Sequence, residues 1–226
     1  MIKYIRMNKV LSFVVCAVLA LGSHPLHAQI THTANGDVDQ NASKVLKQAV
    51  GKLNAAPVSF NVTMISKNSK KKEVSRQKVQ VLFNKGKYKV QADDHMFYCN
   101  GKDIWHWDKA SNECILNKMT EDDDDLMNPA ALLGNYAVNY KAKYIRMEND
   151  GTAVIDLTPK KGRSFYKIRV LVNTNNGQLK SLTMHNYDSS CAEYQISEFK
   201  SGVAATDADF VFPASKNPKV EVIDMR

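Results

Sequence analysis

The sequence predicts a mainly β protein, built as one antiparallel sheet of roughly ten or eleven strands that curls into an unclosed barrel. Apolar and polar residues alternate with a period of two in many short segments. Turns rich in Gly and Asn separate these segments at regular spacing, and no intervening helix is long enough for a parallel βαβ crossover. Because so many strands twist together, the sheet is expected to curve around a concave side.

The first 28 residues have the pattern of a secretory signal peptide. Lys3, Arg6 and Lys9 precede an apolar run over 10–21, and Leu26-His27-Ala28 resembles a cleavage site. The run is too short to span a bilayer comfortably. We therefore expect export and cleavage near Ala28, followed by a flexible N-terminus over 29–40 and one folded domain over 41–226.

Charge argues against a nucleic-acid partner. Removal of residues 1–28 lowers the formal net charge from +8 to +5, and no basic stripe is interleaved with aromatic residues. The densest basic cluster, 67–72, is interpreted as a solvated hairpin tip, with a partner-docking patch as the alternative.

The folded part begins with a predicted helix over 41–54. One face carries the apolar residues, which are Ala42, Val45, Leu46, Ala49, Val50 and Leu53. Pro57 ends this helix, and the period then changes to two in the strand that contains Val58, Phe60, Val62 and Met64. Further strands are predicted around 79–83 and 88–92, and later around 141–147, 153–157, 163–172, 179–184 and 191–199.

Between 93 and 118 the chain predicts two tight hairpins. Asn100-Gly101 has the signature of a two-residue turn, which would place Tyr98 opposite Asp103 and Met96 opposite Trp105. A four-residue turn at 109–112 would place Trp107 opposite Cys114.

A second, short helix is predicted at about 126–134. Asn128-Pro129 supplies an N-cap and a proline at the first helical position, and the residues that follow are apolar. The two helices are the available covers for the concave side. Barrels of this size enclose more space than their own side chains fill, so a ligand cavity is expected.

Three cysteines, Cys99, Cys114 and Cys191, remain after cleavage. Exported proteins often contain disulfides, and pairing Cys99 with Cys114 is the obvious arrangement. In the predicted register, however, Cys114 shares a face with the tryptophans, whereas Cys99 shares the other face with Ile104 and His106. A disulfide cannot join opposite faces of a sheet, so free and mostly buried thiols are predicted.

The sequence shows no recognisable arrangement of catalytic residues. His95, His106 and His185 are scattered, and no Ser or Cys has the neighbours of an activated nucleophile. Asp122–Asp125 could suggest calcium, but an EF-hand glycine and distal Glu are absent, and acidic residues before a helix are stabilised by its dipole. We therefore predict no enzyme activity, no catalytic residue, no metal and no cofactor.

The candidate site is apolar. A cavity is predicted from residues thought to share the concave face, with ordinary core packing as the alternative; these residues are Phe60, Val62, Tyr88, Met96, Tyr98, Trp105, Trp107 and Leu116. The short helix is predicted to be its lid, through Leu126, Met127, Pro129, Leu132 and Leu133.

Three segments give the mature chain a resemblance to the LolA-type periplasmic lipoprotein carriers. They are NGKDIWHWD at 100–108, NPAALL at 128–133 and FVFPASKNPKVEVID at 210–224. The resemblance implies an unclosed antiparallel barrel with helices over its concave face, which agrees with the strand pattern. The chain departs from the family near 83–88. The resemblance implies an arginine there that holds the lid shut, but this sequence has none, and Lys85 is the nearest substitute.

The resemblance also implies a function. Such carriers accept acylated lipoproteins from an ATP-driven complex of the inner membrane, shield the acyl chains in the periplasm and pass them to an outer-membrane acceptor or to the outer membrane itself. A monomer is expected. The alternatives are a periplasmic sensory or regulatory domain on the same scaffold, which would bind a partner protein or free lipid, and a secreted lipid-modifying enzyme.

Overall fold

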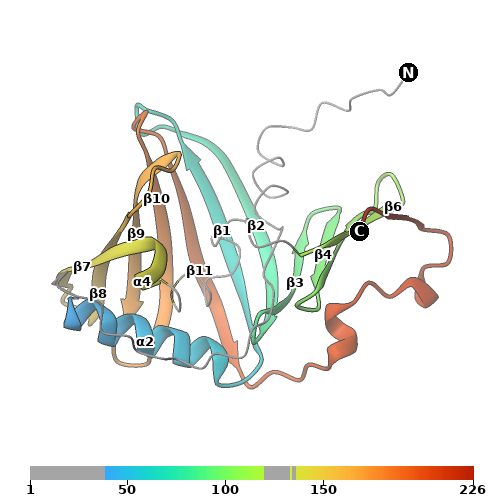
Figure 1. The fold of residues 1–226 in the computed structure, drawn as a ribbon, viewed down its shortest axis with the longest axis horizontal. Helices are drawn as coiled ribbons and strands as arrows, with labels where there is room; N and C mark the ends of the chain where they lie inside the picture. The colour runs from blue at the N-terminus through green and yellow to red at the C-terminus, as the bar shows by residue number, and fades with distance from the viewer. Residues whose placement is uncertain (1–38, 120–132, 134–135) are drawn as a thin grey trace.

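The computed structural model describes residues 39–119, 133 and 136–226. Within them a twelve-stranded sheet has the order β12-β6-β5-β4-β3-β2-β1-β11-β10-β9-β8-β7 (Figure 1). The strands are β1 (Val58–Lys67), β2 (Glu73–Asn84), β3 (Lys87–Ala92), β4 (His95–Cys99), β5 (Asp103–Asp108), β6 (Glu113–Lys118), β7 (Tyr140–Met147), β8 (Thr152–Pro159), β9 (Phe165–Asn173), β10 (Gln178–Asn186), β11 (Cys191–Ser201) and β12 (Glu221–Asp224).

The predicted fold class is confirmed. Neighbouring strands are antiparallel except for β12, which pairs in parallel with β6, and β12 and β7 lie at opposite ends of the sheet, so the barrel does not close. The sequence prediction of ten or eleven strands missed β12. This strand has only four residues, all of them exposed, so it lacks the apolar alternation that identifies the others.

Two α-helices are described, α2 (Gln40–Asn54) and α4 (Tyr136–Asn139). Figure 1 shows α2 across the lower end of the curved strands β7–β11. The helix starts one residue earlier than predicted, because Asp39 is its N-cap and accepts a hydrogen bond from the Ala42 N–H at 3.0 Å. The other carboxylate oxygen of Asp39 accepts from the Tyr144 N–H of β7 at 2.8 Å, which ties the helix start to the sheet edge.

The apolar face of α2 fills one half of the concave side. Its residues Ala42, Leu46 and Ala49 are fully buried in a cluster with inward-facing side chains of β8, β9 and β10. A Cβ added at Gly177, which has φ +71°, would lie 3.1 Å from the Gln48 carbonyl oxygen, so the β9–β10 turn approaches the helix backbone closely. This half of the sheet therefore holds a packed core.

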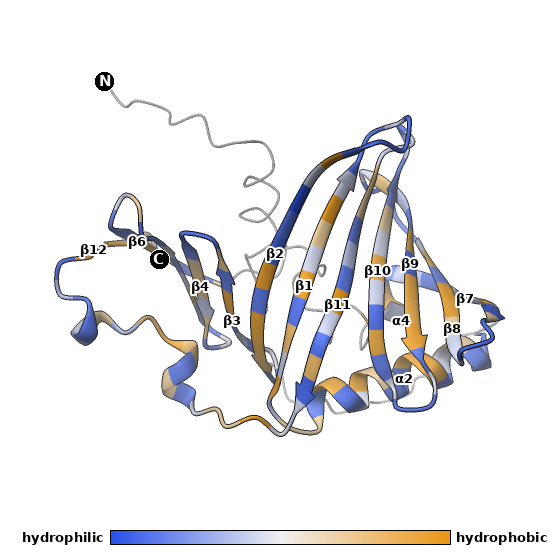
Figure 2. Ribbon diagram, turned by 180° about the vertical axis from the view of Figure 1, so that it is seen from behind, coloured by the Kyte–Doolittle hydropathy of each residue, from blue (hydrophilic) through white to orange (hydrophobic). Residues whose placement is uncertain are grey.

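The period-two alternation seen in the sequence recurs as bands of hydropathy along the strands (Figure 2). After β11 the chain runs through two short 3₁₀ turns, Asp207–Phe210 and Ala214–Lys216, to reach the far edge of the sheet at β12. In the part of the chain that the structure describes, no helix is both long and apolar enough to cross a membrane.

Candidate functional site: an apolar pocket on the concave face

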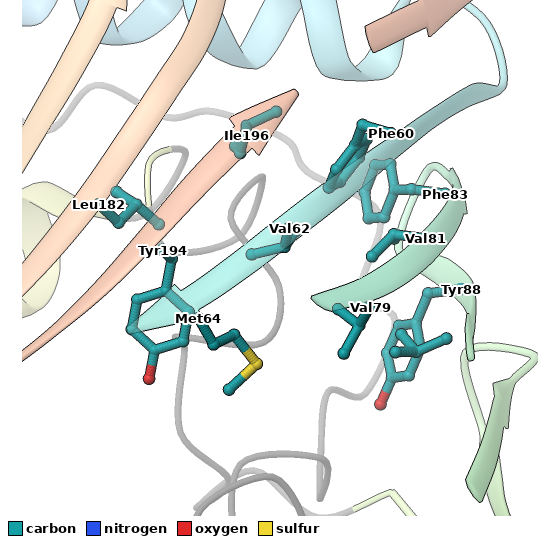
Figure 3. A pocket seen from close by; sticks show the side chains of 11 residues that line it. Phe60, Val62, Met64, Val79, Val81, Phe83, Tyr88, Leu182, Tyr194 and Ile196 are labelled. Atoms are coloured by element: carbon teal, nitrogen blue, oxygen red, sulfur yellow. The ribbon is translucent and has the colours of Figure 1, made fainter. Parts of the chain in front are cut away.

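The half of the concave side that α2 does not fill contains a pocket (Figure 3). About 630 Å³ of it is free of protein atoms, part of this open to solvent. The lining consists of aliphatic and aromatic side chains, which are Phe60, Val62, Met64, Val79, Val81, Phe83, Tyr88, Val90, Leu182, Tyr194 and Ile196. None of these described lining residues carries a charged side chain, so the pocket suits a hydrocarbon rather than a polar ligand.

The pairing register of the strands places these side chains next to one another. Val62 of β1 pairs with Val79 of β2 on one side and with Ile196 of β11 on the other. Val81 in turn pairs with Val90 of β3. Directly paired residues point to the same face of a sheet, so four neighbouring strands present a continuous apolar wall.

Exposure differs across the pocket. Phe60, Phe83 and Tyr88 at its base are at most 5% exposed. Val62, Met64 and Ile196 are only half-buried, although they are apolar and lie on the same face. The upper wall therefore has apolar surface that the described residues leave without a packing partner.

Of the eight residues predicted to line the cavity, the structure brings three together in this pocket, namely Phe60, Val62 and Tyr88. The other eight lining residues were missed as site residues. The alternation that predicted their strands could have identified them. The cavity was instead assigned mainly to the aromatic-rich hairpins at 93–118.

The remaining five predicted residues do not line this pocket. They form a separate cluster on the opposite, convex face of β4–β6, which comprises Met96, Tyr98, Trp105, Cys114 and Leu116 with Phe212, and Trp107, Val211 and Val220 packed against it. Phe212 meets Trp107 and Tyr98 edge-on, at ring-centroid distances of 5.4 and 6.1 Å. The C-terminal segment thus covers this surface, and we call the set the tryptophan cluster.

This placement has a simple cause in the β3–β4 turn. Asp93-Asp94 is a two-residue turn with Ala92 opposite His95, so His95, Phe97 and Cys99 continue the concave face of β3. Even-numbered residues face the pocket side in β3, but odd-numbered residues do so in β4. Tyr88 and Tyr98 therefore lie on opposite faces.

The predicted register at Asn100-Gly101 is wrong by two residues. Tyr98 pairs with Trp105 and Met96 with Trp107, because the loop contains four residues rather than two. The Asn100 side-chain oxygen accepts hydrogen bonds from the Lys102 and Asp103 N–H groups, at 2.9 and 2.8 Å, and this stabilises the longer loop. A shift of two residues leaves each side chain on its predicted face. The second turn is as predicted, with Trp107 opposite Cys114.

The three described cysteines are free and buried, as predicted. Cys99 packs with Ile104 on the concave side, while Cys114 belongs to the tryptophan cluster. Burial raises the pKa of the Cys114 thiol to about 12, so it stays protonated and unreactive.

Two histidines lie side by side on the concave face of β4 and β5. His95 Nδ1 and His106 Nε2 are 3.1 Å apart, and the His106 ring stacks on Phe97 at 4.4 Å between centroids. Burial, and then the neighbouring His95, lower the pKa of His106 to about 4, so its ring is neutral near pH 7. No acidic or sulfur ligand completes a metal site around them among the described residues.

The predicted lid falls mainly outside the described residues, since Leu126, Met127, Pro129 and Leu132 are not among them. Leu133 is described and is 1% exposed, in the cluster beneath α2 rather than in the pocket lining. Lys85, the nearest substitute for the family's arginine, is exposed in the β2–β3 turn with φ +48°.

A second hollow, which we call the rim groove, adjoins the pocket and shares Met64 and Tyr194 with it. It extends along β1, β2, β10 and β11 to their hairpin tips. Its further lining is mostly polar, and includes Ser66, Lys67, Asn68, Ser69, Ser75, Gln77, Asn186, Asp188, Ser190 and Glu193. The lining thus changes from apolar in the pocket to mostly polar in the rim groove.

An unclosed antiparallel barrel with an apolar pocket on its concave face defines a container for an apolar ligand. A profile of the family of the outer membrane lipoprotein carrier protein LolA matches residues 93–213, more than half of the chain. The chain belongs to this family. No curated protein sequence matches it significantly.

Solved structures match most of the chain at low identity. An uncharacterized conserved protein from Thermus thermophilus is 12% identical, with a TM-score of 0.55 over 82% of this chain and 99% of its own. A LolA superfamily protein from Nitrosomonas europaea is 13% identical, with a TM-score of 0.42 over 76% and 97% of the two chains. A putative outer membrane lipoprotein-sorting protein domain from Vibrio parahaemolyticus is 11% identical, with a TM-score of 0.45 over 80% and 99%. The first of these matches shows a common fold, and none of them shows a function.

Proposed function

We propose that this protein is a periplasmic carrier, which shields the acyl chains of lipoproteins on their way from the inner to the outer membrane. The observation that carries the proposal is the pocket of apolar side chains on the concave face that the described residues leave unfilled. Membership in the LolA family supports it.

The energetics require such a container. Burial of hydrocarbon is worth about 0.8 kcal/mol per CH₂, so a long acyl chain needs roughly 10 kcal/mol to enter water. Contact with Val62, Val79 and Ile196 would replace that exposure with an apolar surround. No proton transfer or covalent step is needed, so this function calls for no catalytic group.

Transport between the two membranes would require a partner at each membrane. The carrier would receive acylated lipoproteins from an ATP-driven releasing complex of the inner membrane and deliver them to an acceptor at the outer membrane, or to that membrane itself. Because the ligand must also leave, an opening at the rim groove serves the function better than a sealed core.

Native mass spectrometry of protein isolated from its own cells tests the proposal. Adducts with the mass of an acylated lipoprotein or its acyl-modified N-terminus are expected, and a pocket variant such as Val62→Glu should lose them. Co-purification of a non-acylated protein, with no lipid adduct, would point instead to a regulatory domain on this scaffold.

A further inference from the structure

The lysine-rich turn between β1 and β2 lies beside the turn between β10 and β11. Lys70, Lys71 and Lys72 are consecutive and exposed at the first tip. Lys71 Nζ donates to the Ser189 carbonyl oxygen of the second tip at 2.6 Å. The two tips thus form one end of the molecule, opposite α2 (Figures 1 and 2), and we call them the paired tips.

The backbone of the first tip is fixed. Asn68 Oδ1 accepts hydrogen bonds from the N–H groups of Lys70 and Lys72, at 3.0 and 3.1 Å. Lys71 has φ +62°, which completes the tight loop. The three ammonium groups are therefore presented by an ordered turn.

The carboxylates nearby are engaged with other groups. Glu73 pairs with Arg76 at 2.8 Å, and Glu193 with Lys67 at 3.0 Å. Asp188 accepts from the backbone and the side chain of Ser190, at 2.9 and 2.6 Å. Among the described residues, Lys70 and Lys72 have no carboxylate within ion-pair distance. Asp188 keeps its charge beside Lys71, because Ser190 is uncharged, but the three lysines outnumber it. The end of the paired tips consequently carries a net positive charge that is available to an external anion.

Exposed aromatic rings accompany this charge. Tyr187 is 71% exposed and Tyr166 is 42% exposed, with ring centroids 5.7 Å apart. Lys167 Nζ lies 5.8 Å from the centre of the Tyr166 ring. Tyrosine is enriched where proteins meet the interface of a membrane, since its ring is apolar and its hydroxyl is polar.

The rim groove leads to the same end. It starts at Met64 and Tyr194 in the pocket and reaches Asn68 and Ser69 of one tip, and Asp188 and Ser190 of the other. A surface held against the paired tips would therefore lie at the exit of the apolar pocket.

We propose that the paired tips dock on the anionic headgroups of a lipid bilayer, through Lys70, Lys71 and Lys72 with Tyr166 and Tyr187. The proposal rests on the proposed function for its purpose, because docking would align the groove with the membrane that supplies or receives the acyl chain. These three lysines and two tyrosines are exposed and line neither the pocket nor the rim groove, so they fit a broad anionic surface better than one acidic protein.

Vesicle co-sedimentation tests the docking. The purified protein is mixed with vesicles of phosphatidylcholine alone, or of phosphatidylcholine with phosphatidylglycerol, at low and high salt. Binding is expected only to the anionic vesicles, and weaker at high salt. Each lysine near an anionic surface strengthens binding roughly fivefold, so K70E/K71E/K72E should bind about 100-fold more weakly.

A matched control separates local from overall charge. K44E/K47E/K141E changes the net charge equally at three exposed lysines of α2 and β7, away from the tips, and should bind within about threefold of wild type because screening confines the effect to nearby charges. Y166S/Y187S keeps the charge and should weaken binding several-fold. Circular dichroism checks that each variant is folded.

Two results would overturn the docking proposal. One is an equal loss of binding in the tip and control variants. The other is a wild-type protein that ignores anionic vesicles, including the case in which it binds an acidic protein instead. Titration with a fluorescent fatty acid reports on the pocket separately. If vesicle binding follows the prediction but the fatty acid does not bind, the proposed function fails and the docking surface stands.

Discussion

The tryptophan cluster and the pocket are two apolar surfaces on opposite faces of the same sheet. In the tryptophan cluster, Phe212 and its neighbours from the C-terminal segment lie over the rings, and Trp105 is 9% exposed. In the pocket, Val62 and Ile196 are as apolar but stay half-buried. Among the described residues, the two surfaces differ in whether a segment packs over them and not in the apolar character of their strands, so the cover decides whether a surface becomes core or container.

The largest effect is expected from truncation in the tryptophan cluster. Trp105→Ala should destabilise the protein by about 3–5 kcal/mol, because a buried ring leaves a cavity between Leu116 and the C-terminal segment. Urea unfolding measures this loss. The affinity for a fluorescent fatty acid should stay unchanged, since Trp105 does not line the pocket. A small loss of stability together with weaker binding would return Trp105 to the cavity.

The second-largest loss of stability is expected from a change in the C-terminal segment that covers the tryptophan cluster. Phe212→Ala should cost about 3 kcal/mol, at the lower end for a buried aromatic, because the segment around it can partly collapse. It should also shift Trp107 fluorescence to longer wavelength, since the two rings are 5.4 Å apart and water would enter. Unchanged emission in the folded variant would show that the C-terminal segment does not seal this face.

A smaller effect concerns pH and the concave face of the same hairpin. The folded pKa of His106 is about 4, below its unfolded value of about 6.5. Between these values the unfolded chain binds more protons, so stability is full above about pH 6.5 and is lost as pH falls toward about 4. The loss should be on the order of 2 kcal/mol, given the burial of the ring.

Denaturant unfolding at about pH 7 and about pH 4.5 measures this loss of stability. Other groups also titrate in this range, so His106→Gln is the control that removes only the contribution of His106. The wild type should lose more stability than His106→Gln between the two conditions. Equal losses would mean that the His95–His106 pair is open to solvent.

The strands were predictable from sequence because period-two alternation is local, and Asn-Gly or Asp-rich turns mark where it stops. Which side of the sheet holds a cavity could not be predicted from this local pattern. It depends on the Asp93-Asp94 turn, which inverts the numbering parity between β3 and β4, and on Phe212, which is more than a hundred residues from Trp105 along the chain. β12 was missed for a different reason, since its four exposed residues show no apolar alternation.

The central claim is that the pocket, and not the tryptophan cluster, takes the acyl chain, and filling it tests this most directly. Val62→Trp places a large ring in pocket space that the described residues leave open, so stability should change by less than about 1 kcal/mol. Fluorescent fatty-acid titration of Val62→Trp, with Trp105→Ala as the opposite-face control, should show binding at least about tenfold weaker for Val62→Trp alone. Wild-type affinity in Val62→Trp, or its loss in Trp105→Ala, would contradict the account.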